Sequence, residues 1–299
     1  MESGISDLIK NLIKEVGNCI KAGEWQEAVD ASFDAVSKAR SMNMGGELDV
    51  LGLALALETQ GDIHRQTGDL EQSRTSYSEA LELLSSIPNA SETLARVNAS
   101  TGVLYDLSGN NDEAILFYQH ALTLYEALEE PRYDEIVDIC NNLGFIYRGL
   151  GDGDNAAELF TKGLGISQQL NGARHPKTAL LHNNLGALYL NAGRLEPAHQ
   201  NLVMALEIRG ESLGRKHTDT AQSYSNLAIV MVGQDGDATT IIDYFQKASD
   251  IYEENIATKF YDYEVVMENF ADYLRSQNEG KKATGIEKKA KKNLAKLAS

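Results

Sequence analysis

The sequence predicts an all-α protein, a right-handed superhelical solenoid of about seven antiparallel helix pairs. Two sets of glycines return along the chain with a step of about 42 residues, and small and bulky residues keep the same step beside them. A fixed period of this length indicates stacked units, each made of a helix, a tight turn and a second helix. The glycines expected at the turns are Gly23, Gly68, Gly109, Gly151 and Gly193.

The second set of glycines falls within the first helix of each unit. It comprises Gly61, Gly102, Gly144 and Gly186, with Ala228 next. Bulky residues recur at one position of the second helix, at Tyr77, Tyr118, Phe160 and Leu202, with Ser32 in the first unit. A small residue on one helix lets a large side chain of its neighbour approach closely. We therefore expect the recurrent aromatic residues to be core residues: Tyr105, Tyr118, Tyr147, Phe160 and Tyr189.

The units follow one another without a long polar linker. They are expected over residues 1–40, 48–85, 92–129, 134–170, 176–211, 218–254 and 261–280, which together make a solenoid over 1–280. The first unit is degenerate, because Val16 stands where glycine is expected. Pro131 precedes the fourth unit, and Pro176 begins the fifth, where its missing N–H costs nothing. The sixth turn, at 234–237, holds one extra residue, so we expect its second helix to be shifted by one.

The last segment, 281–299, is expected to be a basic C-terminal capping helix that completes the last pair. It holds seven lysines and one glutamate, whereas the whole chain has a net charge of −17. Ile286, Ala290, Leu294 and Leu297 recur at helical spacing and form an apolar stripe. One face is thus available for the stack and the other for water, as the end of a repeat array requires.

Composition and motifs exclude several classes of function. The acidic charge argues against nucleic acid as a partner, and no run of about 20 apolar residues would span a membrane. The N-terminal segment has no signal-peptide pattern, and Cys19 and Cys140 fall in different units, so we expect a cytoplasmic protein with free thiols. No phosphate loop, nucleophile elbow or metal-binding motif is found. We expect a protein that is not an enzyme and binds no cofactor and no metal.

The recurring glycines, small residues and bulky residues form a pattern that resembles the tetratricopeptide repeat family. Each set of residues at equivalent positions of the repeat is called a column below. The resemblance rests on two fragments, Leu143-Gly144-x-x-Tyr147…Gly151…Ala156…Phe160 and Leu185-Gly186-x-x-Tyr189…Gly193…Ala198…Leu202. The family's ordinary period is 34 residues, so the longer step here is similar to that of kinesin light chain repeats. The segment from His175 to Gly186 also resembles a kinesin light chain repeat. The resemblance implies that the first helix of each unit lines a concave surface.

A row of asparagines occupies this first helix. Asn142, Asn184, Asn226 and Asn269 share one column, two positions before the small residue. An amide offers one acceptor and two donors, so such a row suits the backbone of an extended peptide. The alternative is a buried structural asparagine that ties one helix to the next. The candidate peptide-binding groove comprises these four residues with Asn141, Arg148, Asn183 and Asn191.

The sequence leaves three functions open. The first is a non-catalytic scaffold or adaptor that binds extended, basic peptide segments of other proteins in the concave groove. The alternatives are a fixed structural subunit of a larger motor-associated or ciliary assembly, and a ligand-responsive regulatory sensor. Chaperone-binding members of the family use a lysine and an asparagine four residues apart on one first helix. At the equivalent positions here, which are 58/62, 99/103, 141/145, 183/187 and 225/229, that pair is absent, so heat-shock chaperone tails are not expected partners.

Overall fold

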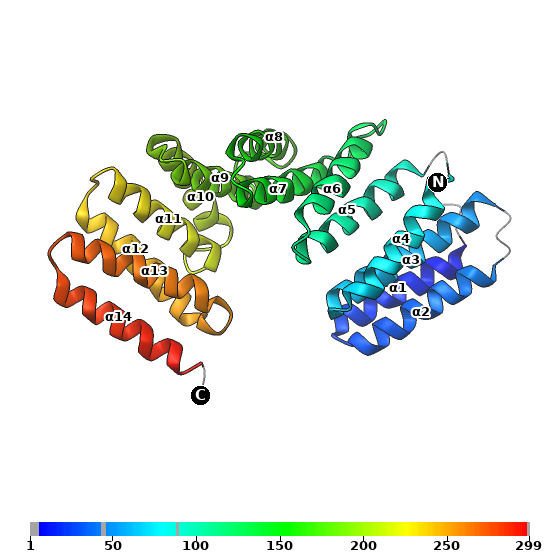
Figure 1. Ribbon diagram of the computed structural model, residues 1–299, viewed down its shortest axis with the longest axis horizontal. Helices are drawn as coiled ribbons and strands as arrows, with labels where there is room; N and C mark the ends of the chain where they lie inside the picture. The colour runs from blue at the N-terminus through cyan, green and yellow to red at the C-terminus, as the bar shows by residue number, and fades with distance from the viewer. Residues whose placement is uncertain (1–5, 43–45, 88–89, 298–299) are drawn as a thin grey trace. The chain divides into compact units, whose positions relative to one another are not determined.

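The fold is known from a computed structural model that describes residues 6–42, 46–87 and 90–297. The chain divides into two compact units, residues 1–146 and 147–299, and each is described by itself. Both consist of α-helices joined by short connections (Figure 1). Among the described helices, none is long and apolar enough to cross a membrane.

The described residues form fourteen helices and confirm the predicted all-α architecture (Figure 1). Consecutive helices pack as antiparallel pairs within each unit: α1 with α2, α3 with α4 and α5 with α6 in the first, and α9 with α10, α11 with α12 and α13 with α14 in the second. The first eight helices are α1 (Asp7–Ala22), α2 (Trp25–Ser41), α3 (Glu47–Thr67), α4 (Leu70–Ser85), α5 (Ser91–Leu107), α6 (Asn111–Glu126), α7 (Tyr133–Gly149) and α8 (Gly153–Asn171). Those of the last three pairs are α9 (Pro176–Asn191), α10 (Leu195–Ser212), α11 (Thr218–Gly233), α12 (Ala238–Glu254), α13 (Ile256–Ser276) and α14 (Gly280–Ala295).

The turn within each pair has one geometry. The five predicted turn glycines all have positive φ, between 70° and 87°. Beyond each of them the next backbone N–H donates to the carbonyl five residues earlier, as from Asp69 to His64 at 2.8 Å and from Arg194 to Tyr189 at 2.8 Å. This is the Schellman arrangement, in which a left-handed residue satisfies the last carbonyls of a helix. In the last pair Asn278, with φ of 60°, takes the place of glycine.

Glycine is required at one position of the first helix in several pairs, because a bulky side chain of the second helix lies against it. A Cβ atom on Gly61 would stand 2.5 Å from the ring of Tyr77, and one on Gly102 would stand 2.7 Å from the ring of Tyr118. In the fifth pair a Cβ atom on Gly186 would meet Leu202 at 2.5 Å. The two sequence columns are therefore the two sides of one contact, between the first and second helix of a pair.

Replacing Gly102 by alanine is expected to lower the free energy of unfolding by about 1–2 kcal/mol. Overpacking a filled core costs about 1–3 kcal/mol, and better helix propensity returns less than about 1 kcal/mol. Gly165 in α8 is the matched control, because a Cβ atom there meets nothing within 4 Å. Gly165→Ala should stabilise by about 0.5–1 kcal/mol. Chemical denaturation of both variants measures the difference, and equal shifts would refute this account.

The predicted aromatic core holds only in the second helices. Tyr118 and Phe160 are 1% and 0% exposed. Tyr105, Tyr147 and Tyr189 are half-buried, so their assignment as core residues was wrong. They stand near the turn at the end of a first helix. There Tyr105 stacks on Phe117 with ring centroids 5.4 Å apart, and the Arg194 guanidinium lies 4.7 Å from the ring of Tyr189.

Two departures from the repeat have clear packing reasons. In the first pair Val16 is fully buried together with Ser32, so the larger residue lies on the first helix and the smaller one on the second. In the sixth pair the extra turn residue shifts the buried positions of α12 by one, as predicted. The buried residue of that column is Phe245, at 1% exposure, whereas its neighbour Tyr244 is half-buried.

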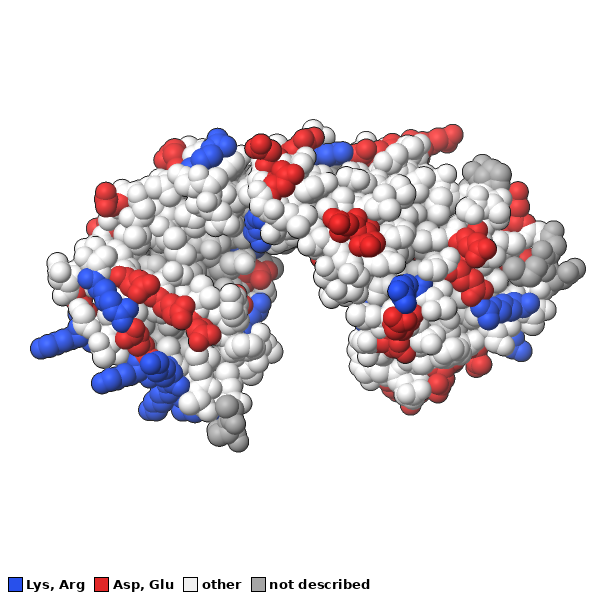
Figure 2. Space-filling view, in the orientation of Figure 1, with Lys and Arg blue, Asp and Glu red and all other residues white. Residues whose placement is uncertain are grey.

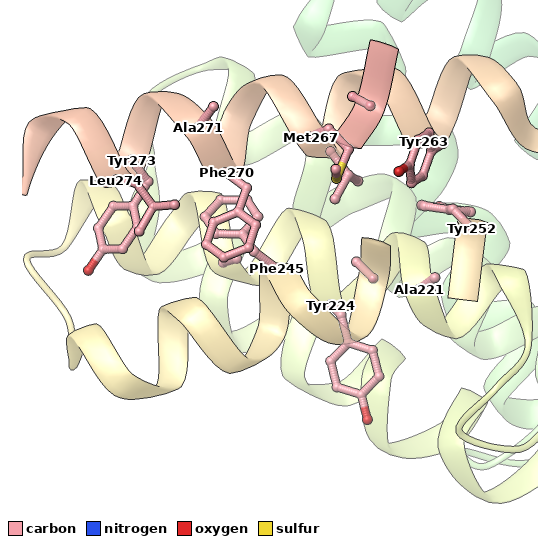
Figure 3. Packing of buried hydrophobic residues seen from close by; sticks show 14 of the residues in the cluster. Ala221, Tyr224, Phe245, Tyr252, Tyr263, Met267, Phe270, Ala271, Tyr273 and Leu274 are labelled. Carbon is pink, nitrogen blue, oxygen red and sulfur yellow. The ribbon is translucent and has the colours of Figure 1, made fainter. Parts of the chain in front are cut away.

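The core of the second unit ends on α13 and α14. Phe245 of α12 packs against Phe270 and Tyr273 of α13, with Met267 in the same cluster (Figure 3). From α14, Ala283 and Ala290 are buried in this cluster, and Ile286 and Leu294 pack against it. Leu297 was expected to join this apolar stripe. It lies beyond the end of α14 and is 44% exposed.

Candidate functional site

The predicted asparagine row divides into amides with and without internal partners. In the first unit, Asn142 is half-buried, and its Nδ2 donates to the hydroxyl of Tyr118 at 3.2 Å. Asn141 Nδ2 lies 3.5 Å from the Asn142 side-chain oxygen. Burial raises the pKa of Tyr118 above its usual value, and the nearby Asp106 carboxylate adds to this rise. The Asn142 amide therefore supplies a hydrogen-bond donor to a buried hydroxyl oxygen.

In the second unit, Asn183 belongs to an interior polar network. It is 2% exposed, and its Nδ2 donates to Gln222 at 3.1 Å while its Oδ1 accepts from Ser223 at 3.4 Å. Arg209 of α10, also 2% exposed, donates through Nη1 to Ser223 at 2.9 Å and to the Asp219 carbonyl at 2.7 Å. Burial lowers the pKa of this guanidinium. The network joins α9, α10 and α11 and thus has a structural role.

The other predicted residues of α7 and α9 differ in their exposure. Asn184 is 2% exposed, so its side chain is not presented to a ligand. Asn191, seven residues later on α9, is exposed at the end of the helix. Arg148 is half-buried, and burial lowers the pKa of its guanidinium. Asn183 and Asn184 thus have the burial that the structural alternative implied.

Asn226 on α11 and Asn269 on α13 differ from the buried or hydrogen-bonded asparagines described above, because their side chains are neither fully buried nor hydrogen-bonded within the described residues. Both are half-buried, and neither side-chain amide makes a hydrogen bond to another part of the described chain. Asn269 lines a hollow of about 250 Å³ together with Ile229 and Val232 of α11, the helix that carries Asn226. The floor of this hollow is Phe245, and Tyr273 forms part of its wall. An unpaired amide therefore adjoins a mostly apolar hollow of the size of one or two side chains.

One acidic group borders this hollow. The Asp272 carboxylate lies 2.9 Å from the Arg275 guanidinium, and both side chains are largely exposed. Burial raises the pKa of Tyr273, with the Asp237 carboxylate as a second cause, so this hydroxyl stays protonated and can donate a hydrogen bond. The hollow can thus hold an apolar side chain while Asn269 bonds to a peptide group, and the Asp272 carboxylate at its edge is paired with Arg275.

Sequence reasoning missed the residues that give this site its shape. Ile229, Val232 and Tyr273 read only as core positions at helical spacing, and nothing in the repeat pattern marks them as the lining of a hollow. Gln222 was also missed. It lies four residues before Asn226 on the same face of α11 and reaches Asn183 of α9.

Comparison with known proteins identifies the repeat. The tetratricopeptide repeat family matches residues 52–127 and 136–211, about half of the chain. No curated protein sequence matches significantly.

Several solved structures share the fold. BtubC (BKLC) from P. vanneervenii is 24% identical over 77% of this chain and 92% of its own, with a TM-score of 0.66. The nearly identical repeats of a kinesin light chain from Podosopora anserina are 15% identical, cover 70% of this chain and 98% of their own, and give a TM-score of 0.57. A Rap protein in complex with competence and sporulation factor is 15% identical, covers 98% of this chain and 78% of its own, and gives a TM-score of 0.60.

Proposed function

Because this chain belongs to the tetratricopeptide repeat family, whose repeats generally bind proteins, we propose that it is a non-catalytic scaffold or adaptor that holds an extended peptide segment of a partner protein. The observation that carries the proposal is the pair of amides on α11 and α13, Asn226 and Asn269, which lack internal partners. The Rap protein complexed with competence and sporulation factor, among the structural neighbours, offers a precedent for a bound factor on this fold.

The proposed site lies on the first helices of the last two pairs. Asn226 and Asn269 bond to the peptide backbone, and the hollow lined by Ile229 and Val232 takes one apolar side chain. The chain's net charge of −17 favours a lysine or arginine next to that side chain. Of the other residues in the predicted groove, Asn183 and Asn184 support the helices from inside.

The test uses a set of nine-residue extended peptides that carry one apolar residue flanked by lysines. Replacing both Asn226 and Asn269 by alanine should weaken binding of the best peptide by about 5- to 100-fold, because each hydrogen bond contributes about 0.5–1.5 kcal/mol. Methylating one backbone nitrogen of the peptide should weaken binding too. Gln168→Ala, which removes an exposed amide from α8, is the matched control and should bind normally. Isothermal titration calorimetry measures each affinity.

The alternatives predict other results. A fixed structural subunit would bind the rest of its assembly through its end faces. In that case neither the wild-type chain nor the double alanine variant would bind the peptide, and both would assemble normally. A ligand-responsive sensor would bind the peptide and change its conformation, which small-angle scattering detects. Unchanged peptide affinity in the folded double variant would refute the proposed site.

A further inference from the structure

The outer face of the last helix pair, α13 and α14, carries charged residues. At the matching positions of the preceding pair, α11 and α12, apolar or small residues pack against the next helix. Asn226 and Asn269 share one column, which aligns α11 with α13 at an offset of 43 residues. In this register, apolar or small residues of α11 become charged residues in α13. The pairs are Ala221 and Glu264, Ser225 and Glu268, Ile229 and Asp272, and Val232 and Arg275.

These positions of α11 contribute to the core beneath α13. Ala221 is fully buried in the cluster that α13 completes, and Ile229 and Val232 pack against that cluster (Figure 3). The face of α11 and α12 is thus shaped to receive a helix, and α13 fills it. The face of α13 and α14 repeats that shape with a different lining.

On α13 and α14 this lining encloses a hollow of about 330 Å³. Its floor is apolar and consists of Met267, Ala290 and Leu294. Its rim holds four carboxylates, Glu264, Glu268, Asp272 and Glu287, and two cations, Arg275 and Lys291. Figure 2 shows the acidic row beside the lysines that gather on α14.

The acidic side chains of the rim are not equally neutralised. Arg275 forms ion pairs with both Asp272 and Glu287. Glu264 and Glu268, one turn apart on α13, are exposed, and within the described residues neither forms an ion pair. The groove therefore offers two uncompensated carboxylates above an apolar floor.

We propose that this groove, which we call the end groove, is a second binding site that receives a basic amphipathic helix of a partner protein. Its shape follows from the preceding pair, where the same surface holds an α-helix. Its charge selects lysine or arginine at the edge of that helix, next to Glu264 and Glu268, while apolar residues cover Met267 and Leu294. The α14 helix of a second copy does not fit, because its apolar stripe is already packed against α13.

The test uses a designed helical probe peptide that has an apolar stripe along one face and lysines along both edges of that stripe. The control is the same peptide with a glutamate in place of each lysine. The lysine peptide should bind the full chain, and the acidic one should bind at least tenfold more weakly. Raising the salt from about 0.1 M to about 1 M should weaken binding, because the Debye length falls from about 10 Å to about 3 Å. Fluorescence anisotropy measures these affinities.

Variants of the full chain locate the site. The double variant Glu264→Gln, Glu268→Gln should weaken binding of the lysine peptide by about tenfold. The matched control is Glu113→Gln, Glu158→Gln, which removes two exposed carboxylates elsewhere and should change little. Lys291→Glu should strengthen binding severalfold. The alanine variants of Asn226 and Asn269 should bind this peptide normally, which separates the end groove from the proposed peptide site.

Three results would overturn the proposal. The first is equal binding of the acidic and the lysine peptide. The second is unchanged affinity in the Glu264→Gln, Glu268→Gln variant with an unchanged circular dichroism spectrum. The third is concentration-dependent dimerisation of the wild-type chain in sedimentation equilibrium that this variant abolishes, because a second copy would then occupy the groove.

Discussion

Replacing Phe245 by alanine should lower the free energy of unfolding of the second unit by about 3–5 kcal/mol. The ring is 1% exposed and lies in the middle of the contact between α12 and α13 (Figure 3). It stacks on Phe270 with ring centroids 5.4 Å apart and lies 6.1 Å from the ring of Tyr273. Truncation removes this contact area and leaves a cavity that closely packed helices fill only partly.

Phe260→Ala is the matched control for this prediction. It removes the same side chain from α13, at a position that is 53% exposed, so the expected change is within about 0.5 kcal/mol. Denaturant titration gives the global values, and hydrogen exchange of α12 and α13 shows whether the loss is local. Similar values for the two variants would show that Phe245 does not hold these helices together.

Replacing Arg96 by methionine should cost about 3 kcal/mol in the first unit, because it strands a buried charge. The Glu58 side chain is 7% exposed and accepts hydrogen bonds from Arg96 Nε at 2.7 Å and Nη2 at 2.9 Å. Removing Arg96 from such a pair takes a cationic partner away from a carboxylate that burial has already separated from water. Arg96 is itself 37% exposed, so water reduces the loss from the upper end of the usual range.

Two comparisons separate this effect from simple loss of an arginine. The double variant Glu58→Leu, Arg96→Met should recover most of the stability, because a buried apolar pair needs no compensation. Arg40→Met breaks the Arg40–Glu79 pair, whose side chains are 53% and 37% exposed, and should cost less than about 1 kcal/mol. Thermal denaturation of the three variants decides the matter: equal losses for Arg96→Met and Arg40→Met would contradict the role given to the buried carboxylate.

Much of the fold could be predicted because each pair repeats the same contact. Gly102 and Tyr118 mark the same neighbours as Gly61 and Tyr77, so the pattern states which helices touch. The extra residue in the sixth turn was readable as well, and it correctly moved the buried position to Phe245. A turn glycine such as Gly68 was predictable because few other residues adopt positive φ there.

The candidate site was less predictable, because one sequence column does not place its members in one environment. Asn183 was proposed to bind a peptide, yet it bonds to Gln222 and to Ser223 of the neighbouring first helix. Asn269 came from the same analysis and faces a hollow without an internal partner. The difference depends on the side chains that surround each amide, and these come from other helices.

By itself, the sequence determined that this chain forms helix pairs of the tetratricopeptide type, because periodic small and bulky residues specify local packing. Only the tertiary structure decided which polar residues are available to a partner. Asn226 is half-buried, Asn184 is buried and a charged rim surrounds Met267, and each of these environments depends on whether the next helix covers the residue. A repeat pattern records the contacts that all pairs share, whereas binding surfaces arise where the pairs differ.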